Sequence, residues 1–121
     1  MSALNLSGAP KDGRTRKVTM NGTPGLIRVV TLPTGPLRLT VGPGYDATGA
    51  VVSGTVTASL AKAGTYTDGA AAVAVADGAI RADLAAGESR AVLVSHGLGE
   101  IALSSSVATG YVELTIEAQG A

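Results

Sequence analysis

Apolar and polar residues alternate along most of the chain, in short segments separated by turn residues. The alternation is clearest near the C-terminus, where Val112, Leu114 and Ile116 are interleaved with Glu113 and Thr115. Successive residues of a β-strand point to opposite faces, so a period of two predicts strands with one buried face. The pattern predicts strands over residues 16–20, 26–32, 37–41, 51–60, 71–76, 79–84, 91–94, 98–103 and 111–117.

Glycine-rich turns separate the predicted strands. Asp77-Gly78 lies between two apolar runs, and Asp-Gly in that position is a strong signal for a β-hairpin. Gly42-Pro43-Gly44 is expected to end the strand that precedes it. The run 91–94 is apolar at every position, which predicts a central strand. No long segment has the period of 3.6 residues that an amphipathic helix needs.

These segments together predict an all-β fold, an antiparallel β-sandwich that is immunoglobulin-like or jelly-roll-like. The chain has 121 residues, which is room for one domain. We assign residues 16–121 to that single sandwich domain. Residues 1–15 are rich in Ser, Gly, Pro and charged side chains without a sustained period, so we expect them to form a flexible basic N-terminal arm.

The core has to be built from small aliphatic side chains. The sequence has no Phe, Trp or Cys, and its only aromatic residues are Tyr45, Tyr66 and Tyr111. Large aromatic side chains bury ~150–250 Å² each, so the chain lacks a major source of stability. We therefore expect it to bury part of its apolar surface in a homo-oligomer, of which a trimer is favoured. The lack of cysteine excludes disulfides, thiol catalysis and cysteine-based metal sites.

The formal net charge is zero, but the charges are unevenly distributed along the sequence. Residues 1–62 hold seven basic and two acidic side chains, whereas residues 63–121 hold two basic and seven acidic ones. Two interpretations are open. Either the basic part docks on an acidic partner or on the acidic part of another copy, or the two halves interleave in one sandwich and the charges average out in space.

The densest group of basic residues is the candidate partner-binding site: Lys11, Arg14, Arg16 and Lys17. Such a cluster can neutralise the phosphates of a nucleic acid. A nucleic-acid partner is nevertheless disfavoured, because no aromatic residue is interleaved with the cluster and the chain has no positive net charge. We expect no membrane partner, since the N-terminal residues lack the apolar segment of a secretion signal and no uncharged stretch reaches the ~20 residues of a membrane span.

Residues suited to catalysis are sparse. His96 is the only histidine, and it lies in a predicted turn with Ser95. Adjacent residues of a strand point to opposite faces, so the two are poorly placed to act as base and nucleophile. The sequence also lacks clustered acidic residues for general acid–base catalysis. We therefore expect that the protein is not an enzyme.

Signals for a cofactor or a metal ion are equally sparse. Residues 42–47 imitate a dinucleotide-binding fingerprint, but Pro43 removes a backbone N–H and no helix is predicted to follow, so we interpret the run as a loop between strands. Asp46, Asp68 and Asp77 precede or lie near glycines, as in ordinary turns. A calcium ion would need six to eight oxygen ligands, and no local calcium-binding loop is present. We expect no cofactor and no metal.

Four stretches between Gly54 and Ala118 resemble bacterial and phage immunoglobulin-like domains: GTVTASL, DGAAAVAVADG, LAAGESRAVLV and GYVELTIEA. The composition, rich in Gly, Ala, Thr and Val, also resembles that of small bacteriophage virion proteins such as capsid decoration or cement proteins. The resemblance implies the sandwich architecture without the Cys and Trp of antibody domains. It also implies a location on the capsid surface of a virion, with the major capsid protein or another virion protein as partner.

The expected function is therefore structural. An oligomer of the chain would bind the capsid shell and stabilise it, with the basic arm reaching onto the shell. The alternative is a tail-associated or adhesin-type immunoglobulin-like module that binds a cell surface or a carbohydrate. Sugar-binding faces usually stack exposed aromatic rings on the sugar, and the chain has three tyrosines for that purpose.

Overall fold

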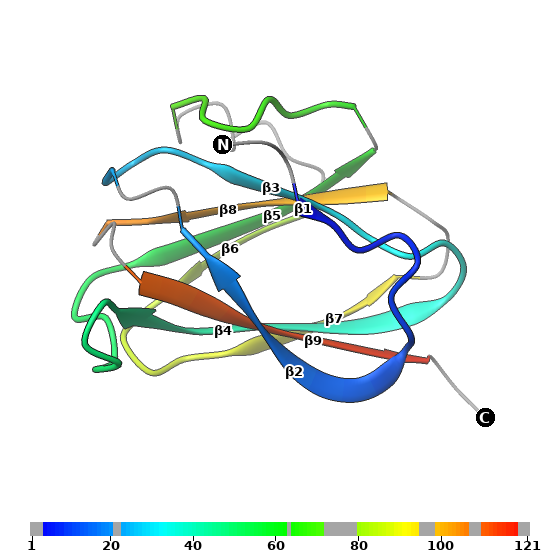
Figure 1. The fold of residues 1–121 in the computed structure, drawn as a ribbon, viewed down its shortest axis with the longest axis horizontal. Coiled ribbons are helices and arrows are strands. Elements are labelled where there is room, and N and C mark those ends of the chain that lie inside the picture. The colour runs from blue at the N-terminus through cyan, green and yellow to red at the C-terminus, as the bar shows by residue number, and fades with distance from the viewer. Residues whose placement is uncertain are drawn as a thin grey trace.

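The computed structural model describes residues 4–20, 23–62, 64–71, 80–94, 99–106 and 110–118. These residues form nine strands in two sheets that pack face to face, and no helix occurs among them (Figure 1). In the five-stranded sheet the order is β1 (Leu4–Asn5), β3 (Arg28–Thr31), β8 (Gly99–Ser105), β5 (Val56–Lys62) and β6 (Ile80–Leu84). In the four-stranded sheet it is β2 (Asp12–Thr19), β9 (Gly110–Ala118), β4 (Leu37–Asp46) and β7 (Arg90–Val94). The prediction of an antiparallel β-sandwich is confirmed.

The strand pairing is that of a long hairpin rolled up on itself. β2 pairs with β9, β3 with β8, β4 with β7 and β5 with β6, all antiparallel. Two further antiparallel contacts, of β4 with β9 and of β5 with β8, join these pairs into the two sheets. Eight strands in this order form a jelly roll, which contains two Greek keys. Of the two architectures that the sequence left open, the strand order is therefore that of the jelly roll.

Rolling up the hairpin interleaves the two halves of the sequence. Every antiparallel pair joins a strand before residue 63 to a strand after it, so strands of the basic and acidic halves alternate across both sheets except at the parallel pair of β1 with β3. Lys17 lies opposite Glu113, and Arg38 lies opposite Glu117. Of the two interpretations of the charge asymmetry, the fold supports interleaving, and docking between a basic and an acidic half loses its basis.

The main core lies between the sheets and consists of aliphatic side chains and one methionine. On β9, Val112, Leu114 and Ile116 are buried in it, as the alternation predicted. Fully burying a side chain of this size contributes about 1.5–3 kcal/mol, so many small contributions replace the missing aromatic residues. The largest fully buried side chains are Ile27, Leu37, Leu39, Leu60, Leu84, Ile101, Leu103, Leu114 and Ile116.

The N-terminal segment belongs to the sandwich, which differs from the expected flexible arm over residues 1–15. β1 pairs in parallel with β3, and β2 begins at Asp12, so both strands start inside that segment. Leu4 and Leu6 pack against the main core where the chain crosses from one sheet to the other. The sequence did not reveal this packing because two apolar residues are too few to show a period, although they pack on one side of the sandwich core.

β4 continues through the glycines that were expected to end it. Its register with β9 shifts between Val41 and Gly44, and the strand then runs on to Asp46. Gly42 has a φ of +91°, and a Cβ at this position would meet the backbone oxygen of Glu88 at 2.5 Å. Between Val41 and Gly44, β4 has one more residue than the paired part of β9. An extra residue of this kind is a β-bulge, and bulges favour glycine as turns do. Residues 42–46 are therefore part of a strand and not a loop between strands.

β7 lies at the edge of its sheet, not at the centre as its apolar sequence predicted. Among the described residues it pairs with β4 alone. Its outward side chain Leu93 is 62% exposed. The apolar run therefore reflects a bare edge strand and not burial on both faces. The turn predicted at Asp77-Gly78, and nearly all of the strand predicted over 71–76, lie outside the described residues.

Candidate docking face

The chain itself covers part of the outer face of the five-stranded sheet, whereas Asp83 of β6 stays exposed on it. Residues 64–71, drawn in green in Figure 1, run along this sheet beyond β3. Tyr66 and Ala70 pack on a second, small hydrophobic cluster of this face, which consists of Ile27, Val29 and Ala102. Three polar residues of the same face are buried, namely Ser59, Glu100 and Ser104, and the covering segment forms hydrogen bonds to the first two.

Hydrogen bonds fasten the covering segment to the sheet. The carboxylate of Glu100, a residue that is only 4% exposed, accepts the backbone N–H groups of Gly64 at 2.8 Å and of Tyr66 at 2.6 Å. The hydroxyl oxygens of Ser59 and Tyr66 lie 2.8 Å apart and share a hydrogen bond. This part of the face is therefore occupied, and a partner could reach the strands beneath it only by displacing these bonds.

The outer face of the four-stranded sheet has no comparable cover among the described residues. Lys17, Arg38 and Leu93 are exposed on it, each from a different strand. We call this surface the open face and define it by the outward side chains of β2, β9, β4 and β7: Thr15, Lys17, Thr19, Arg38, Thr40, Tyr45, Ala91, Leu93, Tyr111, Glu113, Thr115 and Glu117.

A stack of three side chains crosses the open face at one end. The rings of Tyr45 and Tyr111, which are paired across β4 and β9, are stacked with centroids 4.9 Å apart and an interplanar angle of 27°. The ammonium of Lys17 lies 4.7 Å from the centroid of the Tyr111 ring, within the range of a cation–π interaction. The ring of Tyr111 is therefore in contact with two neighbours of its own chain.

Glu113 continues this group of side chains along β9. A hydrogen bond between its carboxylate and the hydroxyl of Tyr45 raises the pKa of Tyr45 above its ordinary value. Glu113 also lies opposite Lys17 in the pairing of β2 with β9. Aromatic, cationic and anionic groups thus meet on one half-exposed surface, and of these residue types tyrosine is the one enriched at protein–protein interfaces.

The four basic residues singled out in the sequence make different contacts. Lys17 belongs to the open face. Arg14 and Arg16 both approach Asp12, with nitrogen–oxygen distances of 3.7 and 3.6 Å. The backbone N–H of Arg14 donates to Asp12 and lowers the pKa of that carboxyl below its usual value. Lys11 precedes β2, and its ammonium lies near Gly35.

Two of the three aspartates considered for metal binding fall in the described part of the chain. Asp46 closes its own loop: the hydroxyl of Thr48 donates to the carboxylate at 2.6 Å, and this bond lowers the pKa of Asp46. Asp68 accepts the backbone N–H of Val29 at 2.8 Å. Among the described residues, no group of three or more potential ligands that could hold a metal ion occurs.

Other predicted candidates lie outside the described residues, namely His96 with its neighbour Ser95, and Asp77. The described residues contain no helix that is long and apolar enough to cross a membrane.

Sequence reasoning missed the aromatic part of the open face. It assigned Tyr111 and Glu113 to the outward side of the last strand, but it placed Tyr45 in a loop. The missing information was the bulge at residues 42–43, which restores Tyr45 to the same face as Tyr111. Comparison of the chain with protein-family models, with curated proteins and with solved structures finds no match.

Proposed function

We propose that this protein is a non-enzymatic structural component of a larger protein assembly and that it docks through the open face. The assembly we propose is a bacteriophage virion, where the protein would bind the major capsid protein at the capsid surface and stabilise the shell. The observation that carries the proposal is the difference between the two sheets. Segment 64–71 of the chain covers part of one outer face, over β3, β8 and β5, and the other face presents its side chains to the surroundings.

The chemistry of the open face suits a protein partner. Tyrosine is enriched at protein interfaces because it combines a large apolar surface with a hydrogen-bonding group. Tyr45 and Tyr111 are already held by stacking, so little side-chain entropy would be lost when a partner covers them. Leu93 is 62% exposed on the same face. The four charged groups of this face balance in sign, which favours a partner with a mixed surface over a strongly charged one.

The fold is compatible with this role. Jelly rolls are common in viral capsid proteins, but they also occur in lectins and enzymes, so the architecture supports the virion role by analogy only. The described part of the N-terminal segment pairs within the sheets, through β1 with β3 and through β2 with β9. Binding therefore requires no rearrangement of the described strands.

Co-sedimentation with capsid shells tests the proposal. The purified protein is mixed with shells of the phage that encodes it, and the bound fraction is measured as a function of concentration. We expect saturable binding that weakens by about tenfold or more in Lys17→Glu, because the substitution reverses a charge beside Tyr111 and Glu113. The matched control is Lys62→Glu, which makes the same charge change at an exposed residue of β5.

Two results would contradict the proposal. One is that the wild-type protein remains in the supernatant at every concentration. The other is that Lys17→Glu and Lys62→Glu weaken binding equally, because a general charge effect would then explain the loss.

A carbohydrate-binding module is the second candidate, and the half-exposed pair Tyr45 and Tyr111 favours it. Sugar rings stack on free aromatic faces. The Tyr111 ring already contacts both Tyr45 and Lys17, so it is less free than Tyr45 to stack on a sugar. A glycan array in which Tyr45→Ala abolishes a reproducible signal would favour this candidate over the first.

A further inference from the structure

The four strands that form the sheet edges in the described part of the chain differ in how they are protected against pairing with another chain. An edge strand exposes unpaired N–H and C=O groups, and proteins usually protect it with charges, bulges, proline or a very short strand. β1 has only two residues. β2 carries four charged residues and an irregular register between Asp12 and Thr15. β6 alternates apolar residues with Arg81 and Asp83.

β7 lacks these forms of protection. Its sequence is Arg-Ala-Val-Leu-Val, with a single charge at one end and no proline. Its register with β4 is regular over all five residues, and no described residue pairs with its other edge. Leu93 projects from it with 62% of its surface exposed. A regular and apolar edge of this kind is suited to strand addition.

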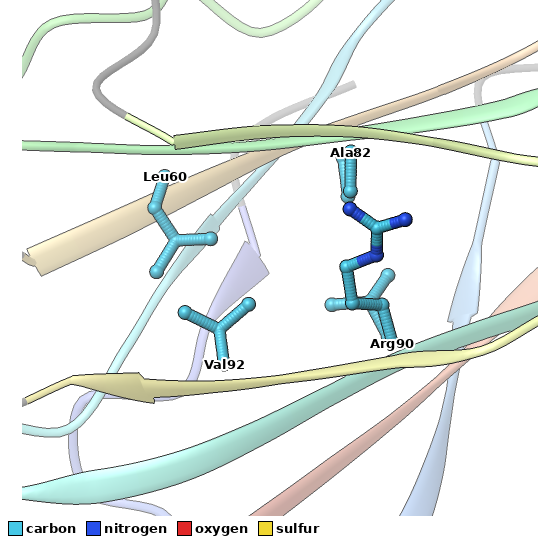
Figure 2. Close-up of a pocket in the computed structure, with 6 residues that line it drawn as sticks. Leu60, Ala82, Arg90 and Val92 are labelled. Carbon is cyan, nitrogen blue, oxygen red and sulfur yellow. The ribbon is translucent and has the colours of Figure 1, made fainter.

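A small apolar cleft adjoins this edge. It lies between β7 and the five-stranded sheet, holds a volume of about 10 Å³, which is room for about one water molecule, and is lined by Val41, Ala58, Leu60, Ala82, Arg90 and Val92. Figure 2 shows Leu60 and Ala82 facing Val92 and Arg90 across the gap between the sheets. On the opposite side of the sandwich, Leu4 and Leu6 pack against the core.

We propose that β7 is a self-association site, at which the β7 strands of two copies pair antiparallel about a two-fold axis. The two four-stranded sheets would then form one continuous sheet of eight strands. The open faces of both copies would lie on the same side of this sheet. The added strand would also cover the rim of the cleft.

The sequence of β7 is complementary to itself in this arrangement. With the two Val92 residues opposite each other, Leu93 lies opposite the partner's Ala91, so the exposed large side chain meets a small one. Arg90 lies opposite the partner's Val94. The two Arg90 residues are then four positions apart along the strands, or roughly 13 Å, which exceeds the screening length of about 8 Å at physiological salt.

Charge does not oppose association of two copies. The formal net charge is zero, so the chains carry no long-range repulsion, and proteins near zero net charge associate more readily. An asymmetric partner would need a strand that matches this register, whereas the second copy supplies one of the right length by symmetry. The self-association goes beyond the proposed docking function, because it involves the purified protein alone.

Sedimentation equilibrium of the full chain tests the proposal. We expect a reversible monomer–dimer equilibrium with a dissociation constant on the order of 10–100 μM, as for a small interface. Leu93→Lys places a lysine on the exposed edge and should raise the dissociation constant at least tenfold. Thr19→Lys is the matched control: it makes the same addition on the same face of the same sheet, but at the opposite edge strand, and should leave the constant unchanged.

Amide hydrogen exchange at low and high protein concentration provides the second readout. The amides of residues 90–94 should become protected as the dimer forms, while those of β2 should not change. A protein that stays monomeric at millimolar concentration, forms a trimer, or dimerises equally well as Leu93→Lys would overturn the proposal. So would protection of residues 90–94 on capsid shells in a protein that is monomeric in solution, because a shell protein would then occupy the edge.

The two proposals fail separately. If Lys17→Glu loses shell binding but retains the dimer, both stand. If the dimer is missing while shell binding still depends on Lys17, self-association is wrong and docking stands.

Discussion

The two outer faces of the sandwich begin from similar strand patterns and end in different environments. On the five-stranded sheet the outward residues Ser59 and Glu100 are buried, because residues 64–71 lie over them. On the four-stranded sheet the outward residues Lys17 and Arg38 are exposed. The local sequence therefore does not determine whether an outward polar residue of a strand is buried or exposed. That depends on whether a distant segment of the chain covers it.

Because of this difference, chemically similar residues have different roles on the two faces. Glu100 accepts two backbone N–H groups in a site closed to water, so its carboxylate contributes to folding. Glu113 lies beside a tyrosine on the open face and remains in contact with solvent. Substitutions at matched residues of the two faces should therefore separate stability from binding.

The largest effect on stability is expected when one glutamate of each face is replaced. Glu100→Ala leaves the amides of Gly64 and Tyr66 without their acceptor, and we expect it to lower the free energy of unfolding by about 2–4 kcal/mol. Glu113→Ala on the open face should change it by less than about 0.5 kcal/mol. Urea denaturation followed by circular dichroism measures both. Equal losses would mean that the two faces do not differ in the way described.

A smaller effect is expected at the paired tyrosines. Tyr66→Phe removes the hydrogen-bond partner of the fully buried Ser59, which should destabilise the protein by about 1–2 kcal/mol. Tyr111→Phe keeps the stacked ring and should be within about 0.5 kcal/mol of the wild type. Thermal unfolding of the two variants at one pH provides the comparison. A larger loss in Tyr111→Phe than in Tyr66→Phe would contradict it.

The smallest effect concerns the titration of Tyr45. The hydrogen bond to Glu113 raises its pKa in the folded state, so this interaction stabilises the protein below the unfolded value of about 10 and is lost as the pH rises through the folded value. Ultraviolet titration of tyrosinate should show one tyrosine that ionises above the ordinary range. In Glu113→Gln this ionisation should shift to lower pH. An unchanged titration curve would show that Glu113 does not act on Tyr45.

The strand pattern could be predicted from the sequence because burial of one face imposes a period of two. β9 shows this most clearly: its buried residues Val112, Leu114 and Ile116 were assigned correctly. Predictions failed where a few residues act against their local signal. Gly42 and Pro43 resemble a turn but form a bulge within β4, and Leu4 and Leu6 are too few to reveal that they close the core.

The candidate site was harder to predict because it depends on pairing between distant strands. Lys17 was singled out for its charge, but its contact with Tyr111 follows from the register of β2 with β9. Nothing in the local sequence indicates that residues 64–71 cover one sheet and leave the other bare. These contacts join residues that are far apart in the sequence, so they become visible only in the folded structure.

The central claim is that the open face, and not the covered face, meets other proteins of the assembly. Chemical acetylation of lysines followed by mass spectrometry tests it directly, because Lys17 lies on the open face and Lys62 is an exposed residue of β5 in the other sheet. The account predicts that incorporation into capsid shells slows acetylation of Lys17 by about tenfold or more, while Lys62 changes by less than about twofold. Equal reactivity of Lys17 in the free and the incorporated protein, or protection of Lys62 instead, would contradict it.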